Sequence, residues 1–135
     1  MGVFDRVRAA LGATGQDTEV AVEPRLDTEA RRAQLDELEQ ALRALARQMA
    51  ARDELMVNPG WRGRVEDLRF AAGEAARLSR SGFDRAALDD LAAQVRPLYG
   101  PGPVPPEYAP HQEAHDRVLA AVAAIRGPLD QEQER

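Results

Sequence analysis

The chain has 135 residues, a net charge of -5 at pH 7, and neither cysteine nor lysine. The missing cysteines exclude disulfides, thiolate catalysis and Cys-ligated zinc, and the missing lysines exclude Schiff-base chemistry and a P-loop phosphate site. The charges form mixed-sign runs, whereas nucleic-acid binding needs a concentrated basic surface. No apolar run is long enough to span a bilayer or to form a signal-peptide core, so we expect a cytoplasmic protein.

Residues 1–11 are predicted to form a short amphipathic helix. Its apolar residues fall on one helical face: Val3, Phe4, Val7 and Leu11. A helix this short is marginal in water, so it needs a surface on which to fold. Three surfaces remain open from the sequence: the protein's own helices, a protein partner, or a membrane.

The opening Met-Gly-Val-Phe, followed by charged residues, resembles the start of phage-shock-protein-A-type membrane-associated proteins. This resemblance implies a peripheral membrane position for the segment and covers only these first residues. The following Gly12-Ala13-Thr14-Gly15 departs from the continuous helix of that family. Residues 12–26 show no hydrophobic period, and we interpret them as a flexible linker.

The longest predicted helix runs from a cap at Asp27 or Thr28 to about Val57. Its apolar residues recur at alternating three- and four-residue steps: Leu35, Leu38, Leu42, Leu45, Met49 and Met56. Such a narrow stripe has to be buried against other helices. Asn58-Pro59-Gly60 is predicted to end this helix, and a loop this short brings the next helix back antiparallel.

A second helix is predicted over residues 61–80, with one large aromatic residue and several alanines on its apolar face. That face consists of Trp61, Val65, Leu68, Ala71, Ala72, Ala75 and Leu78. Phe70 lies off this face, so we expect it to be exposed. It is interpreted either as an exposed residue without a role or as an anchor for a second subunit.

Ser81 and Asp84 have capping-box spacing and predict the start of a third helix, which Pro97 ends. Five prolines between residues 99 and 110 then predict an extended strap. Because the strap is long enough to lead back along the third helix, we expect the fourth helix to run parallel to the third. The fourth helix is predicted from Pro110 to the Gly127-Pro128 stop.

Together these elements predict an all-α protein. An antiparallel helical hairpin is extended to a four-helix bundle-like domain, with a proline-rich strap before the last helix and a short N-terminal amphipathic helix. The expected division is an amphipathic segment at 1–11, a linker at 12–26, a bundle at 27–127 and a polar tail at 128–135 that buries nothing. The low aromatic content of 4% fits a core of Leu, Ala and Val.

His111 and His115 lie four residues apart on the predicted fourth helix, a spacing at which two imidazoles can bind one metal ion. The zinc-protease pattern needs Glu directly after the first histidine, where this chain has Gln112. Glu107 or Asp116 would have to supply a third ligand. The pair is therefore a weak metal candidate.

The favoured interpretation of the two histidines is structural. We expect both imidazoles to lie at the end of an apolar seam and to form hydrogen bonds with Tyr99, Tyr108 or strap carbonyls. The sequence predicts no metal and no other cofactor. Protonation of these histidines is expected to loosen the contact between the fourth helix and the strap.

Other polar residues are given structural interpretations. Ser79 and Ser81 are expected in turn and capping roles, because neither lies in a nucleophile elbow. The arginines after the Asn-Pro-Gly-Trp turn are expected to be solvated and to pair with Glu66 and Asp67; they are Arg62, Arg64 and Arg69.

These observations favour a non-catalytic helical interaction module, a scaffold or regulatory subunit, with homodimerisation through the long hairpin as one form of it. The predicted interaction residues are Val3, Phe4, Val7, Leu11 and Phe70. Two alternatives are a peripheral membrane-surface protein anchored by residues 2–11 and a small metal-binding protein or enzyme using His111 and His115. The expected partner is a protein or a second copy, with no nucleic acid.

Overall fold

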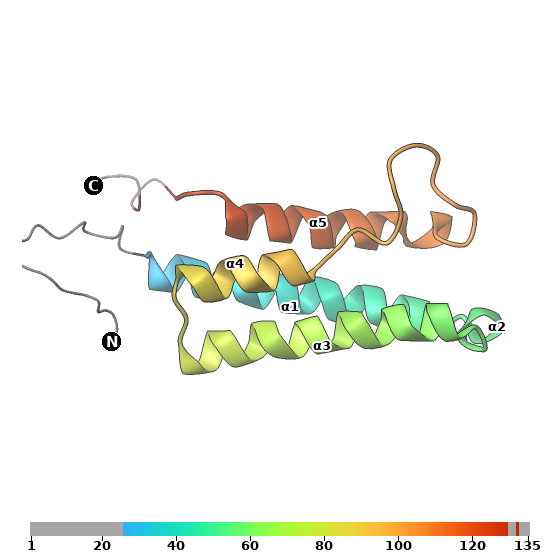
Figure 1. The fold of residues 1–135 in the computed structure, drawn as a ribbon, viewed down its shortest axis with the longest axis horizontal. Helices are drawn as coiled ribbons and strands as arrows, with labels where there is room; N and C mark the ends of the chain where they lie inside the picture. The colour runs from blue at the N-terminus through green and yellow to red at the C-terminus, as the bar shows by residue number, and fades with distance from the viewer. Residues whose placement is uncertain (1–25, 130–131, 133–135) are drawn as a thin grey trace, which may run out of the picture.

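A computed structural model describes residues 26–129 and Glu132, and in this part of the chain every regular element is helical. The all-α prediction is confirmed. The long helices are α1 (Thr28–Ala50) and α3 (Pro59–Ser81), joined by the single turn α2 (Asp53–Met56). They are followed by α4 (Arg85–Gln94), the 3-10 turn η1 (Ala109–His111) and α5 (Gln112–Arg126), as Figure 1 shows.

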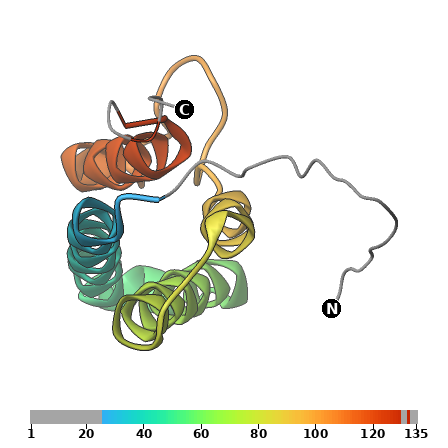
Figure 2. The ribbon, with the colours of Figure 1, turned by 90° about the vertical axis from the view of Figure 1, so that its left-hand side faces the viewer.

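Helices α1, α3, α4 and α5 surround one core, which is clearest in the view along their axes (Figure 2). Helix α1 packs against α3 and α5, and α4 packs against the same two helices from the other side. Among the described helices, the backbones of α1 and α4 do not approach each other closely, so these two lie diagonally across the core. Successive long helices run in opposite directions (Figure 1).

The expectation that the last helix runs parallel to the one before it is wrong. Helix α5 begins beside the end of α1, and its last carbonyls lie beside Arg31 at the start of α1. The physical reason is the length of α4, which has 10 residues against 23 in α3, about 15 Å against about 35 Å. The strap therefore continues in the direction of α4, along the part of α3 that α4 does not cover. Helix α5 then runs back towards the start of α1.

The apolar stripe of α1 forms the centre of the core, as its spacing predicts. Five of its side chains have no solvent exposure: Leu35, Leu38, Leu42, Leu45 and Met49. The predicted face of α3, from Trp61 to Leu78, is buried against them. Alanines at 71, 72 and 75 of that face allow α3 to approach α1 closely.

The predicted continuous helix from Asp27 to Val57 is wrong at its far end. Asp27 caps α1 by accepting a hydrogen bond from the Ala30 amide at 3.1 Å, but the helix ends at Ala50 and resumes only as α2. At the break the Met49 carbonyl accepts the Trp61 indole N–H at 2.9 Å. The same carbonyl also accepts the Arg52 amide at 3.1 Å, so the indole of Trp61 adds a bond from α3 to the end of α1.

The turn between α3 and α4 also differs from its predicted capping. Asp84 caps α4 by accepting from the Ala87 amide at 2.9 Å, while the Ser81 hydroxyl donates to the Arg77 carbonyl of the preceding helix. The reversal takes place at Gly82, whose φ of 104° is a conformation that favours glycine. The predicted capping box starting at Ser81 is therefore wrong, although the helix boundary lies where it was expected.

Leu42→Ala should lower the free energy of unfolding by about 2 to 5 kcal/mol, because it opens a cavity in a fully buried position. Denaturant unfolding measures this change. Gln40→Ala, two residues away on the exposed side of α1, is the matched control and should change stability by less than about 0.5 kcal/mol. Equal effects of the two substitutions would contradict the described core.

Candidate functional site

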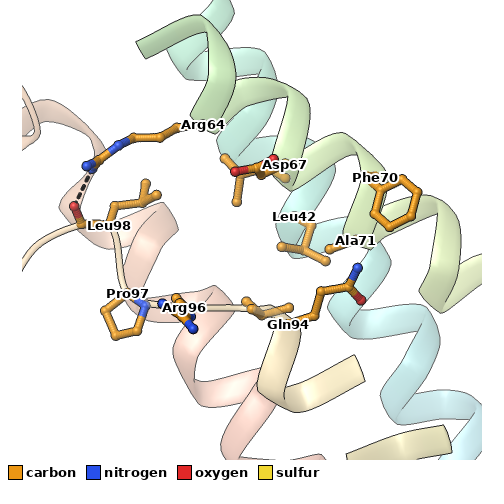
Figure 3. Close-up of a pocket in the computed structure, with 11 residues that line it drawn as sticks. Leu42, Arg64, Asp67, Phe70, Ala71, Gln94, Arg96, Pro97 and Leu98 are labelled. Atoms are coloured by element: carbon orange, nitrogen blue, oxygen red, sulfur yellow. Dashed lines mark hydrogen bonds between the residues drawn. The ribbon is translucent and has the colours of Figure 1, made fainter. Parts of the chain in front are cut away.

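A groove opens between α3 and residues 94–98, at the point where α4 ends. It encloses about 460 Å³ and has the buried Leu42 of α1 at its floor. Its apolar walls are formed by Leu68, Ala71, Val95, Pro97 and Leu98, and Figure 3 shows these elements facing one another. The groove is the opening that remains because α4 covers only part of the length of α3.

The sequence itself ends α4 at this place. Val95 is already extended, with φ of -94° and ψ of 105°, and it precedes Arg96-Pro97, where proline disfavours helix in the residue before it. Residues 95–98 therefore form an irregular wall opposite α3. Val95 is buried, and Leu98 is half-buried against the core.

Phe70 lies on the rim of this groove and is 62% exposed. The prediction that it lies off the buried face of α3 is confirmed. Val57, in the turn before α3, is the other large hydrophobic residue that is strongly exposed in the described part of the chain, at 76%. Val57 does not line the groove, whereas Phe70 adds an exposed aromatic ring to the apolar walls.

Charged groups surround the groove. Asp67 lies on the α3 side and Arg96 on the opposite wall (Figure 3). Arg64 reaches across from α3 and donates to the Leu98 carbonyl at 2.6 Å and to the Tyr108 hydroxyl at 2.7 Å. The predicted pairing of Arg64 with a neighbouring acid is therefore wrong, because its guanidinium ties α3 to the strap.

His111 is buried at the start of α5 and faces the break between α1 and α2. Its Nε2 lies 3.1 Å from Nη1 of Arg52, and its Nδ1 lies 3.1 Å from Oε1 of Gln48. Because a guanidinium can only donate, Nε2 is the acceptor and the ring proton belongs on Nδ1. Burial, followed by the charge of Arg52, lowers the pKa of His111 below its ordinary value.

His115 is buried one turn further along α5 and holds the beginning of the strap. Its Nε2 accepts the Leu98 backbone N–H at 3.0 Å, and its ring lies 4.4 Å from the Tyr99 ring centre. The proton is then on Nδ1, which has no hydrogen-bond partner among the described residues. Burial lowers the pKa of His115, against the opposing effect of Asp116.

The partners of the two histidines differ from those expected. Neither ring accepts from Tyr99 or Tyr108 or donates to a strap carbonyl; the Tyr99 ring only packs against His115, with the two planes tilted by 31°. The two Nε2 atoms are each occupied by a separate donor, which leaves no shared metal position between them. Within residues 26–129 and Glu132, no group of three His, Asp or Glu side chains is arranged to hold a metal ion.

A buried ion pair joins the start of α1 to Glu132, in the chain beyond the end of α5. Arg31 has no solvent exposure and donates to the carboxylate of Glu132, with Nε to Oε2 at 2.9 Å. Its two terminal nitrogens also donate to the Ile125 carbonyl at 2.9 Å and the Gly127 carbonyl at 2.8 Å. These carbonyls belong to the C-terminal end of α5, where a positive charge is favourable.

The tail was expected to bury nothing, but the side chain of Glu132 is buried. Its carboxylate also accepts the Asp27 amide at 2.8 Å, and the hydrogen bonds from Arg31 are the main reason that the pKa of Glu132 falls to about 2. Arg31 was not identified from the sequence. Its position in the helical repeat could have indicated it. Arg31 lies four residues before Leu35, so it places a charged side chain on the apolar face of the helix.

Four predicted interaction residues, Val3, Phe4, Val7 and Leu11, lie outside the described residues, as do the 1–11 segment and nearly all of the 12–26 linker. The helices among the described residues are too short or too polar to cross a membrane. The chain matches no known family model, and neither the curated proteins nor the solved structures gave a significant match.

Both histidines should titrate below pH 6.5 in the folded protein, since protonating either Nε2 would place a donor against a donor. With the folded pKa lowered, the unfolded chain binds more protons near pH 6. Their contribution to stability is therefore full above about pH 6.5 and falls as the pH drops below it. NMR titration of the ring protons measures this, and titration of both rings at or above pH 6.5 would contradict it.

Glu132→Gln should lower stability at pH 7 by on the order of 1 to 3 kcal/mol, because it leaves the buried Arg31 without its counter-charge. In the wild type this contribution is present above the ordinary glutamate pKa of 4.5 and is lost as the pH falls towards about 2. Denaturant unfolding at pH 7 and pH 3 tests the prediction. The matched control is Glu113→Gln, an exposed glutamate on α5, and a similar loss in both variants would refute the role of the pair.

Proposed function

We propose that this protein is a non-catalytic interaction module, a four-helix bundle whose groove between α3 and residues 94–98 binds an apolar segment of a protein. The observation that carries the proposal is Phe70, which is 62% exposed on the rim of that groove. Burying a Phe side chain is worth roughly 1.5 to 3 kcal/mol. The exposed ring and the apolar walls beside it offer that gain to a bound partner.

The chemistry of the groove favours a polypeptide over a small polar substrate. Its walls are mainly aliphatic, and its volume of about 460 Å³ is suited to one or two large side chains. Asp67 and Arg96 lie on opposite sides of it (Figure 3). The proposed occupant is therefore an amphipathic segment with a large apolar anchor, an acidic group beside Arg96 and a basic group beside Asp67.

The positions of the chemically versatile side chains support a non-catalytic role. The Ser79 hydroxyl donates to Asp36 at 2.9 Å, and the Ser81 hydroxyl donates to the Arg77 carbonyl. Both imidazoles are buried. His111 contacts Arg52 at the break after α1, and His115 accepts the Leu98 amide at the start of the strap. These groups are engaged in supporting the fold rather than converging on one exposed point.

Selection of peptides from a displayed random library on the immobilised full-length protein tests this proposal. We expect enriched peptides to share an aromatic or branched apolar anchor and to lose at least tenfold in affinity for the Phe70→Asp variant. Val57→Asp is the matched control, because it places the same charge at an exposed apolar position outside the groove. Failure to enrich any peptide, or equal binding to both variants, would refute the proposed groove function.

A further inference from the structure

Phe70 and the groove beside it lie on one surface of the molecule. The ring is 62% exposed at the rim, next to apolar walls that include the buried Val95. In a two-fold contact between identical molecules, the same surface of each copy supplies both the projecting group and its receptor. This surface has both parts, because the exposed ring projects from α3 beside a groove of about 460 Å³. Its shape is therefore suited to a second copy of itself.

The two walls of the groove run side by side in opposite chain directions. Along the groove, Asp67 precedes Phe70 on α3, and on the facing wall Arg96 precedes Gln94 in the same direction (Figure 3). The acid and the arginine therefore stand towards one end of the groove, on opposite sides of it. Phe70 stands towards the other end, on the side facing the last residue of α4.

The charges on the two walls are available to a partner. Asp67 and Arg96 are both exposed, and neither takes part in an ion pair among the described residues. The other charged group that lines the groove is Arg64, which is engaged with the Leu98 carbonyl and the Tyr108 hydroxyl. An incoming surface thus meets a carboxylate on one wall and a guanidinium on the other.

Two orientations of a second copy place groove against groove. A two-fold axis across the groove at the level of Asp67 brings α3 against α3, so that each Asp67 meets the other Asp67. An axis along the groove instead places α3 of each copy over the facing wall of the other, so that each Asp67 meets the partner's Arg96. Like charges held together at an interface are costly, so the charges favour the axis along the groove.

We infer that a second copy of this chain binds in the groove, as a two-fold dimer in which residues 67–70 of each copy cover the partner's wall at 94–98. This inference rests on the proposed function of the groove and names its partner. Residues 67–70 have the features proposed for the occupant, because Phe70 is the apolar anchor and Asp67 is the acidic group that meets Arg96. The two residues are three positions apart on α3, so both side chains reach the partner from the same side of the helix.

Every contact of such a dimer forms twice. Both exposed Phe70 rings are covered at once, and both pairs of Asp67 and Arg96 form together. Because the dimer fills the groove of each copy, an external peptide competes with self-association and binds in proportion to the fraction of free monomer. Self-association therefore regulates access of other partners to the groove.

Exchange of the two charges in the full-length protein tests this inference. Asp67→Arg and Arg96→Asp each create two like-charge pairs in the dimer, so each variant alone should dimerise at least tenfold more weakly than the wild type in sedimentation equilibrium, roughly the scale expected for such pairs. An equimolar mixture of the two variants should regain the dimer, because each copy then carries the charge that the other needs. Restoration in one chain carrying both substitutions, but not in the mixture, would show that the charges pair within one molecule and would overturn the inference.

Two sets of variants serve as controls. Glu29→Arg and Arg47→Asp make the same changes of charge at exposed positions on α1, outside the groove, and should leave dimerisation at the wild-type level. Phe70→Asp should abolish the dimer, because the contact would then bury two carboxylates. Far-UV circular dichroism checks that every variant keeps its helices.

A wild type that remains monomeric at millimolar concentration would overturn the inference, as would dimers that persist in both single charge variants. The groove proposal has its own readout in the peptide selection. Peptides that bind the wild type but not Phe70→Asp, together with a monomeric wild type, would disprove the second copy as the partner and leave the groove function standing.

Discussion

Helix α1 buries one apolar stripe against two helices, α3 and α5, and the position of every other element follows from this double contact. The five large apolar side chains of this stripe are fully buried, and each contributes roughly 1.5 to 3 kcal/mol through burial. Helix α4 lies diagonally across the core from α1, and its backbone approaches α3 and α5 instead. Since α4 is short, its side of the core is the one that opens into a groove.

Polar side chains on α1, together with Arg52 just after it, form hydrogen bonds with both ends of α5. Gln48 and Arg52 meet His111 at the beginning of α5, and Arg31 binds the carbonyls at its end. Hydrogen bonds are directional, whereas apolar contacts between helices allow sliding, so these groups fix the axial register between α1 and α5. His115 extends the same arrangement to the strap through the Leu98 amide, and Leu98 is a wall of the groove.

The sequence predicts the elements governed by local periodicity and capping. The buried stripe of α1, the face of α3 and the exposure of Phe70 follow from helical spacing, and Asp27 follows from cap chemistry. Features that depend on distant partners were missed. The direction of α5 depends on how far α4 extends, and the groove exists only because a helix end, a proline wall and α3 meet in space.

The Arg31 and Glu132 pair has a consequence for the biosynthesis of the chain. The two residues are separated by 101 positions in the chain. A ribosome makes α1 long before it makes Glu132, so the Arg31 guanidinium has to stay hydrated while the first helices are already available to pack. Burial of that charge consequently has to wait for Glu132, and nascent chains keep an unpaired guanidinium at the start of α1 until that residue has left the ribosome.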